Sequence, residues 1–203
     1  MKRAFFVGVV CLFFSQGEAY ESTSEASLYQ LIHYEVALRD VTAQGIDWKI
    51  GDQTSYSLKM LFGQGLMDKE VTKDEGTAFW LTSNVDLMGQ KQKIEALIRK
   101  ADGKTLKLLV NGQEQEIPEP DFEIIEQKEA HIKVSKFPNG IDCIYLKIKD
   151  RKKGDEIETW INPQAVPIDG MLKTIAKQGF MPITLELKDF KRSPHEVSQE
   201  KTN

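Results

Sequence analysis

The stretch KIEALIRKADGKTLKLLVNGQEQEI, residues 93–117, decides the fold of this chain. Apolar side chains recur at every second position on both sides of Ala101-Asp102-Gly103, which is the period of a strand with one buried face. A two-residue Asp-Gly turn would place Ile98 opposite Lys107, whereas a three-residue loop makes every facing pair apolar. These pairs are Ile98 with Leu106, Ala96 with Leu108, and Ile94 with Val110. The longer loop is therefore predicted, with Gly103 at positive φ.

A second turn follows directly in the same stretch. Asn111-Gly112 is a dipeptide that two-residue hairpins prefer, because both positions need a positive φ. This turn sets Val110 opposite Gln113 and Leu106 opposite Ile117. Together the two turns predict a meander of three antiparallel strands.

The alternation continues on both sides of this meander. Residues 56–62 and 79–87 carry apolar side chains at alternate positions, and the polar Lys73–Gly76 turn lies between them. Beyond Pro118 and Pro120, further strands are expected at 122–127, 131–135, 141–149, 156–161, 172–176 and 183–187. About ten short strands at this spacing predict a single all-β, mainly antiparallel domain over residues 48–190.

Residues 1–19 predict a cleaved signal peptide. The first three residues end in Lys2-Arg3, Ala4–Phe14 is apolar, and small residues occupy positions 17 and 19, so cleavage is expected before Tyr20. The apolar run is 11 residues long, whereas a membrane-spanning helix needs about 20. We therefore expect export to the periplasm or beyond, with no transmembrane anchor after cleavage.

The segments that flank the β-rich domain carry weaker patterns. Residues 20–47 are expected to form an N-terminal arm, in which Ser22 and Glu25 have capping-box spacing ahead of a short helix. The alternation across residues 32–38 also fits a strand, so both alternatives stay open. Residues 191–203 are polar and contain Pro194, which predicts a disordered tail.

Charge and cysteine content exclude some classes of protein. The chain has 27 basic and 31 acidic side chains and a net charge of -4, which argues against the nucleic-acid backbone as the main partner. Removal of the signal peptide would leave Cys143 without a partner for an internal disulfide. Cys143 lies in a strand-like run and is interpreted as a small apolar side chain, with a reactive thiol as the alternative.

Motifs for catalysis, metal binding or cofactor binding are absent from the sequence, so no enzyme activity, metal or cofactor is expected. The three histidines are isolated, and Gly63-Gln64-Gly65 is interpreted as a hairpin turn rather than a phosphate loop. A hydrolase triad assembled from distant residues, such as a serine, His131 and an aspartate, is the catalytic alternative. The charged run 147–156 is interpreted as a solvated hairpin tip, with a basic patch as its alternative.

The C-terminal half resembles a family of exported bacterial β-proteins of unknown function. The resemblance covers roughly residues 48–190 and follows the order of its motifs: Lys136-Phe137-Pro138-Asn139-Gly140, a strand with Cys143, Trp160 on a strand, Val166-Pro167-Ile168-Asp169-Gly170, and Thr184–Phe190. Ile141 and Asp142 depart from the small residue and the phenylalanine that are usual there. The resemblance implies a curved sheet or half-open barrel, similar in outline to the lipoprotein-carrier fold, whose concave apolar face receives a lipid or is plugged by the protein's own helix.

These observations lead to two functional hypotheses. The first is a monomeric, non-catalytic carrier for an apolar ligand, such as a lipid or lipoprotein acyl chain, with these wall residues: Phe62, Phe79, Leu81, Leu108, Ile144 and Trp160. The alternative is an envelope adaptor that binds another protein through a sheet edge or its tail. An interior filled by the protein's own side chains would favour the adaptor.

Overall fold

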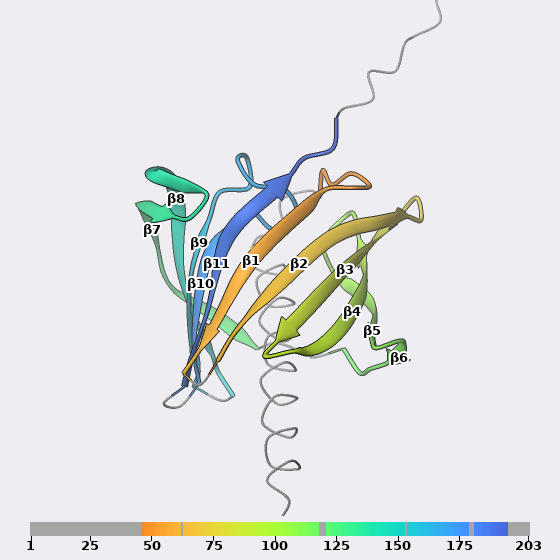
Figure 1. The fold of residues 1–203 in the computed structure, drawn as a ribbon, viewed down its shortest axis with the longest axis horizontal. Helices are drawn as coiled ribbons and strands as arrows, with labels where there is room; N and C mark the ends of the chain where they lie inside the picture. Colours follow the sequence, from red (N-terminus) through yellow and green to blue (C-terminus); the bar gives the residue numbers. More distant parts are fainter. Residues whose placement is uncertain (1–45, 62, 118–120, 153, 179–180, 195–203) are drawn as a thin grey trace, which may run out of the picture. The chain divides into compact units, whose positions relative to one another are not determined.

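The computed structural model describes residues 46–61, 63–117, 121–152, 154–178 and 181–194. They form a single antiparallel sheet of 11 strands (Figure 1), and no helix lies within these ranges. The strands are β1 (Gln53–Met60), β2 (Gly63–Asp74), β3 (Ala78–Leu87), β4 (Gln90–Arg99), β5 (Thr105–Val110), β6 (Gln113–Glu114), β7 (Phe122–Val134), β8 (Phe137–Asp150), β9 (Glu156–Ile161), β10 (Met171–Gln178) and β11 (Met181–Lys191). The predicted all-β antiparallel class is confirmed.

Two meanders build this sheet. Strands β1 to β6 follow one another on one side, strands β7 to β11 follow one another on the other, and β1 pairs with β11 where the meanders meet. Strands β6 and β7 are therefore the two edges of the sheet.

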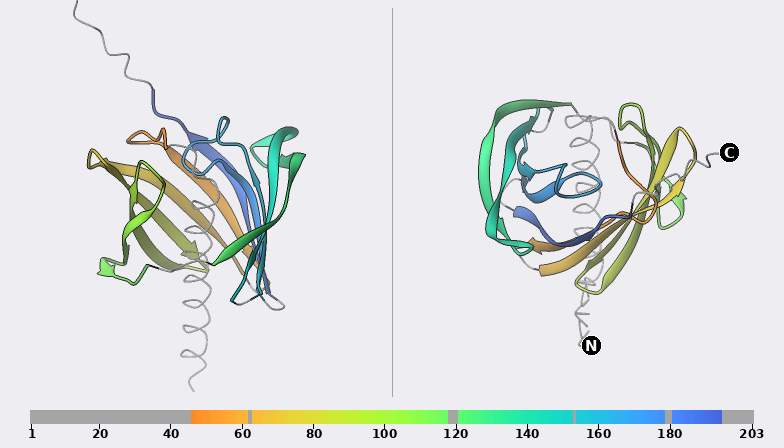
Figure 2. Two further views of the ribbon diagram at one scale, coloured as in Figure 1. Left: turned by 180° about the vertical axis from the view of Figure 1, so that it is seen from behind. Right: turned by 90° about the horizontal axis from the view of Figure 1, so that it is seen from above.

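The short connection between β6 and β7 forces the sheet to curve. Only residues 115–121 separate these opposite edges in the chain. The eight residue steps from Glu114 to Phe122 span at most about 28 Å, whereas ten spacings of about 4.8 Å would separate the edges of a flat sheet by about 48 Å. The sheet curls as Figure 2 shows, but β6 does not pair with β7, so no barrel closes. The predicted curved sheet is confirmed.

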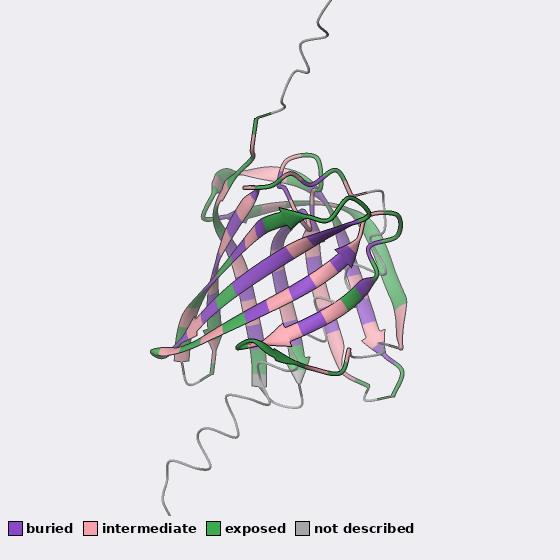
Figure 3. Ribbon diagram, turned by 90° about the vertical axis from the view of Figure 1, so that its right-hand side faces the viewer, coloured by how far each residue is buried: buried purple, intermediate pink, exposed green. Residues whose placement is uncertain are grey.

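Each strand turns one face toward the core. In β1, Thr54, Tyr56 and Leu58 are buried while the intervening side chains are more exposed. The register carries this buried face across the sheet, because Tyr56 lies opposite Met67 on one neighbour and Leu187 on the other. Alternating buried and exposed bands follow the strands in Figure 3. In the C-terminal meander the core includes Ile148, Ile157, Ala176 and Ile183.

The predicted hairpin around Gly103 forms, but its register differs next to the loop. Ala96 lies opposite Leu108 and Ile94 opposite Val110, as predicted. A β-bulge between Leu97 and Ile98 shifts the last pair, so that Ile98 faces Thr105 and Leu106 turns outward. Gly103 has a φ of 72°, as predicted. The bulge interrupts the alternation of β5, where two residues separate the buried Thr105 from the buried Leu108.

The Asn111-Gly112 turn is also confirmed. Both residues have positive φ, and Val110 lies opposite Gln113. Strand β6 ends at Glu114, however, and the Gln115 amide donates a hydrogen bond to the Leu108 carbonyl. The predicted pairing of Leu106 with Ile117 is therefore wrong, because the third strand stops before it reaches Leu106.

Strand boundaries differ from the prediction in two further places. The Gly63-Gln64-Gly65 stretch is the beginning of β2 rather than a turn, because Met60 already pairs with Gly63. The two strands expected at 122–127 and 131–135 are one strand, β7. The turn that follows β7 contacts β11 through a hydrogen bond from the Ser135 hydroxyl to Glu186 (2.8 Å). The hairpin of β7 and β8 thus reaches across to a strand that is not its neighbour in the sheet.

The chain termini are described only in part. The signal peptide and the N-terminal helix expected within residues 1–45 lie outside the described residues. Strand β11 runs to Lys191, and the Ser193 amide donates a hydrogen bond to Asp52 Oδ1 (2.8 Å). The predicted disorder is therefore wrong for residues 191–193, which end a strand or make hydrogen bonds, and residues 195–203 lie outside the described residues.

Candidate functional site

The loop between β9 and β10, residues 162–170, lies on the concave side of the sheet (Figure 2). Backbone hydrogen bonds close it: among them, the Asn162 amide donates to the Gly170 carbonyl (2.7 Å), and the Val166 amide donates to the Asn162 carbonyl (3.0 Å). The Asn162 side chain also accepts the Ala165 amide (2.9 Å). Because the loop is compact, the side chains at its C-terminal end face the sheet.

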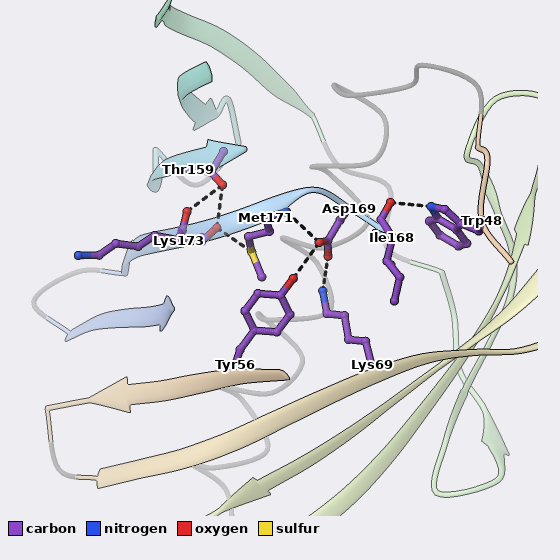
Figure 4. A network of polar contacts seen from close by, with 9 residues as sticks. Trp48, Tyr56, Lys69, Thr159, Ile168, Asp169, Met171 and Lys173 are labelled. Carbon is purple, nitrogen blue, oxygen red and sulfur yellow. Dashed lines mark hydrogen bonds and ion pairs between the residues drawn. The ribbon is translucent and has the colours of Figure 1, made fainter. Parts of the chain in front are cut away.

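Asp169 of this loop forms the centre of a polar network (Figure 4). Its Oδ2 atom is 2.6 Å from Lys69 Nζ of β2. Its Oδ1 atom accepts hydrogen bonds from the Tyr56 hydroxyl of β1 (3.0 Å) and from the Met171 amide (3.1 Å). Both carboxylate oxygens are thus bound, and three separate elements of the fold supply the donors.

The network is buried. The Lys69 side chain is 1% exposed and that of Asp169 is 10% exposed, and Tyr56 is fully buried. Burial by itself raises the pKa of the Asp169 carboxyl, but the charge and hydrogen bond of Lys69 outweigh it, helped by Met171 and Tyr56, so the pKa lies below its usual value of 3.8. The Asp169 carboxyl is therefore ionised at neutral pH, because the nearby Lys69 offsets the cost of burying its charge.

A second contact holds the same loop. The Trp48 indole donates a hydrogen bond to the Ile168 carbonyl (2.6 Å). Ile168 has a φ of 70°, which is unfavourable for a β-branched side chain. Two sets of contacts thus hold the loop at this strained position: Trp48 binds the Ile168 carbonyl, and Lys69 and Tyr56 bind the Asp169 side chain.

The sequence did not single out this network. Lys69, Tyr56 and Asp169 come from segments that are about one hundred residues apart, with sequence separations of 100 and 113 residues from Asp169. Lys69 is the only one of the three with a local signal, because it occupies a buried position between Met67 and Val71 on β2. A lysine at a core position predicts a buried counter-charge.

The structure separates the six predicted wall residues. Phe79, Leu81 and Leu108 lie on the buried face and are 5%, 1% and 2% exposed. Ile144 shares that face, because it pairs with the buried Ile161, but it is exposed.

The other two wall residues do not join them. Trp160 lies on the opposite face of β9, where its ring packs against Tyr145 with centroids 5.1 Å apart. Its predicted place on a concave wall is wrong, because the alternation of β9 gives the inner positions to Ile157, Thr159 and Ile161. Phe62 lies outside the described residues.

Other candidate groups occupy separate places. His131 Nδ1 is 2.7 Å from Asp142 Oδ1 on the exposed β7–β8 hairpin, and no hydrogen bond found in the described ranges brings a serine hydroxyl to this pair. The run 147–156 forms a hairpin, in which Lys147 pairs with Glu156 (2.8 Å). Within the described residues, no cluster of His, Cys, Asp or Glu is arranged to hold a metal ion. The same residues contain no helix long and apolar enough to cross a membrane.

Cys143 lies in strand β8 as predicted and is buried, with its thiol donating a hydrogen bond to the Ala130 carbonyl (3.4 Å). Burial raises the pKa of the Cys143 thiol, with a smaller contribution from the charge of Asp142. We expect iodoacetamide at pH 8 to label Cys143 far more slowly in the folded protein than in urea. Equal labelling rates, measured by mass spectrometry of the intact protein, would contradict the buried thiol.

Comparison with known proteins finds similarity only among solved structures; no family model and no curated protein matches the chain. A crystal structure of MucB is 10% identical over 85% of this chain, with a TM-score of 0.41. The MucA/MucB complex of Pseudomonas aeruginosa is 13% identical over 81% of this chain, with a TM-score of 0.48. A further structure, MucB in complex with MucA(peri), is 12% identical over 79% of this chain, with a TM-score of 0.42. The chain spans 54–61% of the length of these MucB chains.

Proposed function

We propose that the protein is a non-catalytic adaptor of an exported compartment, which binds an extended segment of another protein along β7, an edge strand of the described sheet. The observation that supports this proposal most directly is the edge itself. Strand β7 is 13 residues long and forms the end of the sheet, whereas the opposite edge, β6, has only 2 residues. A long edge strand offers a row of backbone donors and acceptors that another strand can pair with.

The side chains along β7 support the same proposal. Residues 124–129 are exposed, and Ile124 and Ile125 expose 46% and 44% of their surface. Both isoleucines lie beside a β-bulge near one end of the strand, and both side chains are exposed. An incoming strand would cover these two apolar side chains while it pairs with the regular segment that follows.

The concave face gives less support to a lipid carrier. The predicted wall residues Phe79, Leu81 and Leu108 are buried in the chain as it stands. A carrier presents such side chains to its ligand, whereas an adaptor needs them only as core. The exported location rests on the signal-peptide pattern of residues 1–19.

The test is site-specific photo-crosslinking in the organism that makes the protein. A photoreactive amino acid is placed at Gln127 or Glu129, which are exposed on the β7 edge, and at Thr72 or Asn84, which are exposed on strands paired on both sides. We expect the β7 positions to crosslink to a partner and the control positions not to do so. Sequenced crosslinks should also advance residue by residue along β7 and the partner, as an added strand requires.

Two outcomes oppose the proposal. Crosslinking that is equal at the β7 and control positions argues against binding at this edge. Release of a stoichiometric acyl compound, detected when protein purified from its own compartment is denatured in a mass spectrometer, would favour the carrier instead.

A further inference from the structure

We propose that Lys69 and Tyr56 form a carboxylate-binding site on the concave face, which Asp169 of the β9–β10 loop occupies and which an external carboxylate enters when the loop moves out. This inference goes beyond the proposed adaptor function and does not depend on strand β7. It assigns the ligand class by chemistry: a carboxylate at the end of an acyl chain or of a polypeptide.

The first argument is the arrangement of donors. Lys69 Nζ and the Tyr56 hydroxyl approach different oxygens of the same carboxylate, at 2.6 Å and 3.0 Å. Both donors belong to neighbouring strands, so the sheet fixes their spacing whether or not the loop is in place. A cation and a hydroxyl on a rigid, buried surface are the groups that recognise a carboxylate.

The second argument is a polar group that the loop does not satisfy. Thr54 lies directly opposite Lys69 on β1 and is 1% exposed. Its hydroxyl is buried and finds no hydrogen-bond partner among the residues that the structure describes. Buried hydroxyls without partners are rare in folded proteins. An additional donor beside the lysine indicates a polar surface larger than Asp169 alone requires.

The third argument is strain in the loop. Ile168 directly precedes Asp169 and has a φ of 70°, a conformation that is strained for a β-branched residue. The loop keeps this conformation while Trp48 and the Asp169 network hold it. When an external carboxylate displaces the Asp169 side chain, Lys69 keeps an anionic partner and the loop leaves its strained conformation. The loop thus behaves as an internal competitor for the site.

The experiment deletes the internal carboxylate and supplies it again from solution. In the full-length Asp169→Ala variant, formate has the size of the deleted group. We expect formate at tenfold its dissociation constant to raise the unfolding temperature by about 3 °C or more. Chloride at equal ionic strength should have no such effect, and neither anion should stabilise the wild-type protein by this amount.

The double variant Lys69→Met/Asp169→Ala is the matched control, because it lacks the cation that formate would bind. Equal stabilisation of the single and double variants by formate overturns the proposal. If Asp169→Ala does not fold, Asp169→Gly with acetate replaces it. Failure of both variants to fold even with the anion present also overturns it.

Displacement of the loop is tested on the wild-type chain by hydrogen exchange. The probes are dodecanoate and the peptide acetyl-Ala-Ala-Ala-Ala with a free C-terminus, compared with dodecanol and the peptide amide. We expect one of the two carboxylates to speed exchange across residues 163–170, and which one does so identifies the source of the ligand. No change with either carboxylate overturns the displacement. Crosslinking at β7 is unaffected by this result, so the two proposals fail separately.

Discussion

Replacement of Lys69 by methionine is expected to lower the free energy of unfolding by about 3–5 kcal/mol, because it leaves the Asp169 carboxylate buried without its cation. Methionine keeps the length and apolar stem of lysine, so the loss measures charge rather than packing. Urea unfolding followed by circular dichroism measures the change. Lys73 on the same strand is the control: its ion pair with Glu75 is exposed on both sides, and Lys73→Met should cause no measurable loss.

A double-mutant cycle separates the ion pair from other effects of the substitution. Asn at position 169 keeps the shape of the side chain and its acceptor for Tyr56, but carries no charge. The Lys69→Met/Asp169→Asn variant should therefore be more stable than the sum of the two single losses predicts. Strictly additive losses would show that Lys69 and Asp169 are not coupled.

The pH dependence gives a second readout of the same pair. The pKa of Asp169 in the folded protein lies below its usual value of 3.8. The stability that this carboxylate contributes is therefore present above the pKa of the unfolded chain and is lost as the pH falls through the folded value. In Lys69→Met, the Asp169 carboxyl is buried without a cation, which raises its pKa instead of lowering it. Protonation of Asp169 then removes the buried charge and stabilises the variant. The difference in the free energy of unfolding between the wild type and Lys69→Met should therefore become smaller as the pH is lowered from about 7 to about 4.

Local turn chemistry explains why much of the fold is predictable. Asn111-Gly112 specifies its own backbone conformation, and Gly103 meets the positive φ of a three-residue loop. The bulge beside Ile98 is different, since it depends on how β4 and β5 pack into the curved sheet. An alternating sequence pattern predicts which face of a strand is buried, but it does not predict where a β-bulge shifts the register.

The candidate site was not predictable for a related reason. Lys69 interrupts the apolar alternation of β2, and this interruption hid the strand as well as the site. Its partner Asp169 is 100 residues away in a turn next to Gly170. The chain has 31 acidic side chains, and nothing local in the sequence tells which of them a buried lysine will meet. The pairing follows only once β1, β2 and the β9–β10 loop are placed together.

Replacement of Gly170 by alanine is expected to destabilise the protein by about 3 kcal/mol, for two reasons that act at the same residue. Gly170 has a φ of +69°, and a Cβ atom there would lie 2.6 Å from the backbone nitrogen of Pro163. The clash is with backbone rather than with the end of a flexible side chain, so the loop itself has to shift. Thermal or urea unfolding of the variant measures the loss.

Gly76 separates the effect of φ from the effect of the clash. It has a φ of +81°, and nothing lies within 4 Å of a Cβ built on it, so Gly76→Ala should cost only about 1 kcal/mol. Equal losses in the free energy of unfolding for Gly170→Ala and Gly76→Ala would mean that the β9–β10 loop accommodates the Cβ atom without a further loss of stability. Because Asp169 directly precedes Gly170, a forced shift of the loop also moves the carboxylate away from Lys69. Gly170→Ala should therefore lose part of the acid dependence that the Lys69 pair provides, whereas Gly76→Ala keeps it, and this difference links the backbone geometry of the loop to the charge that it carries.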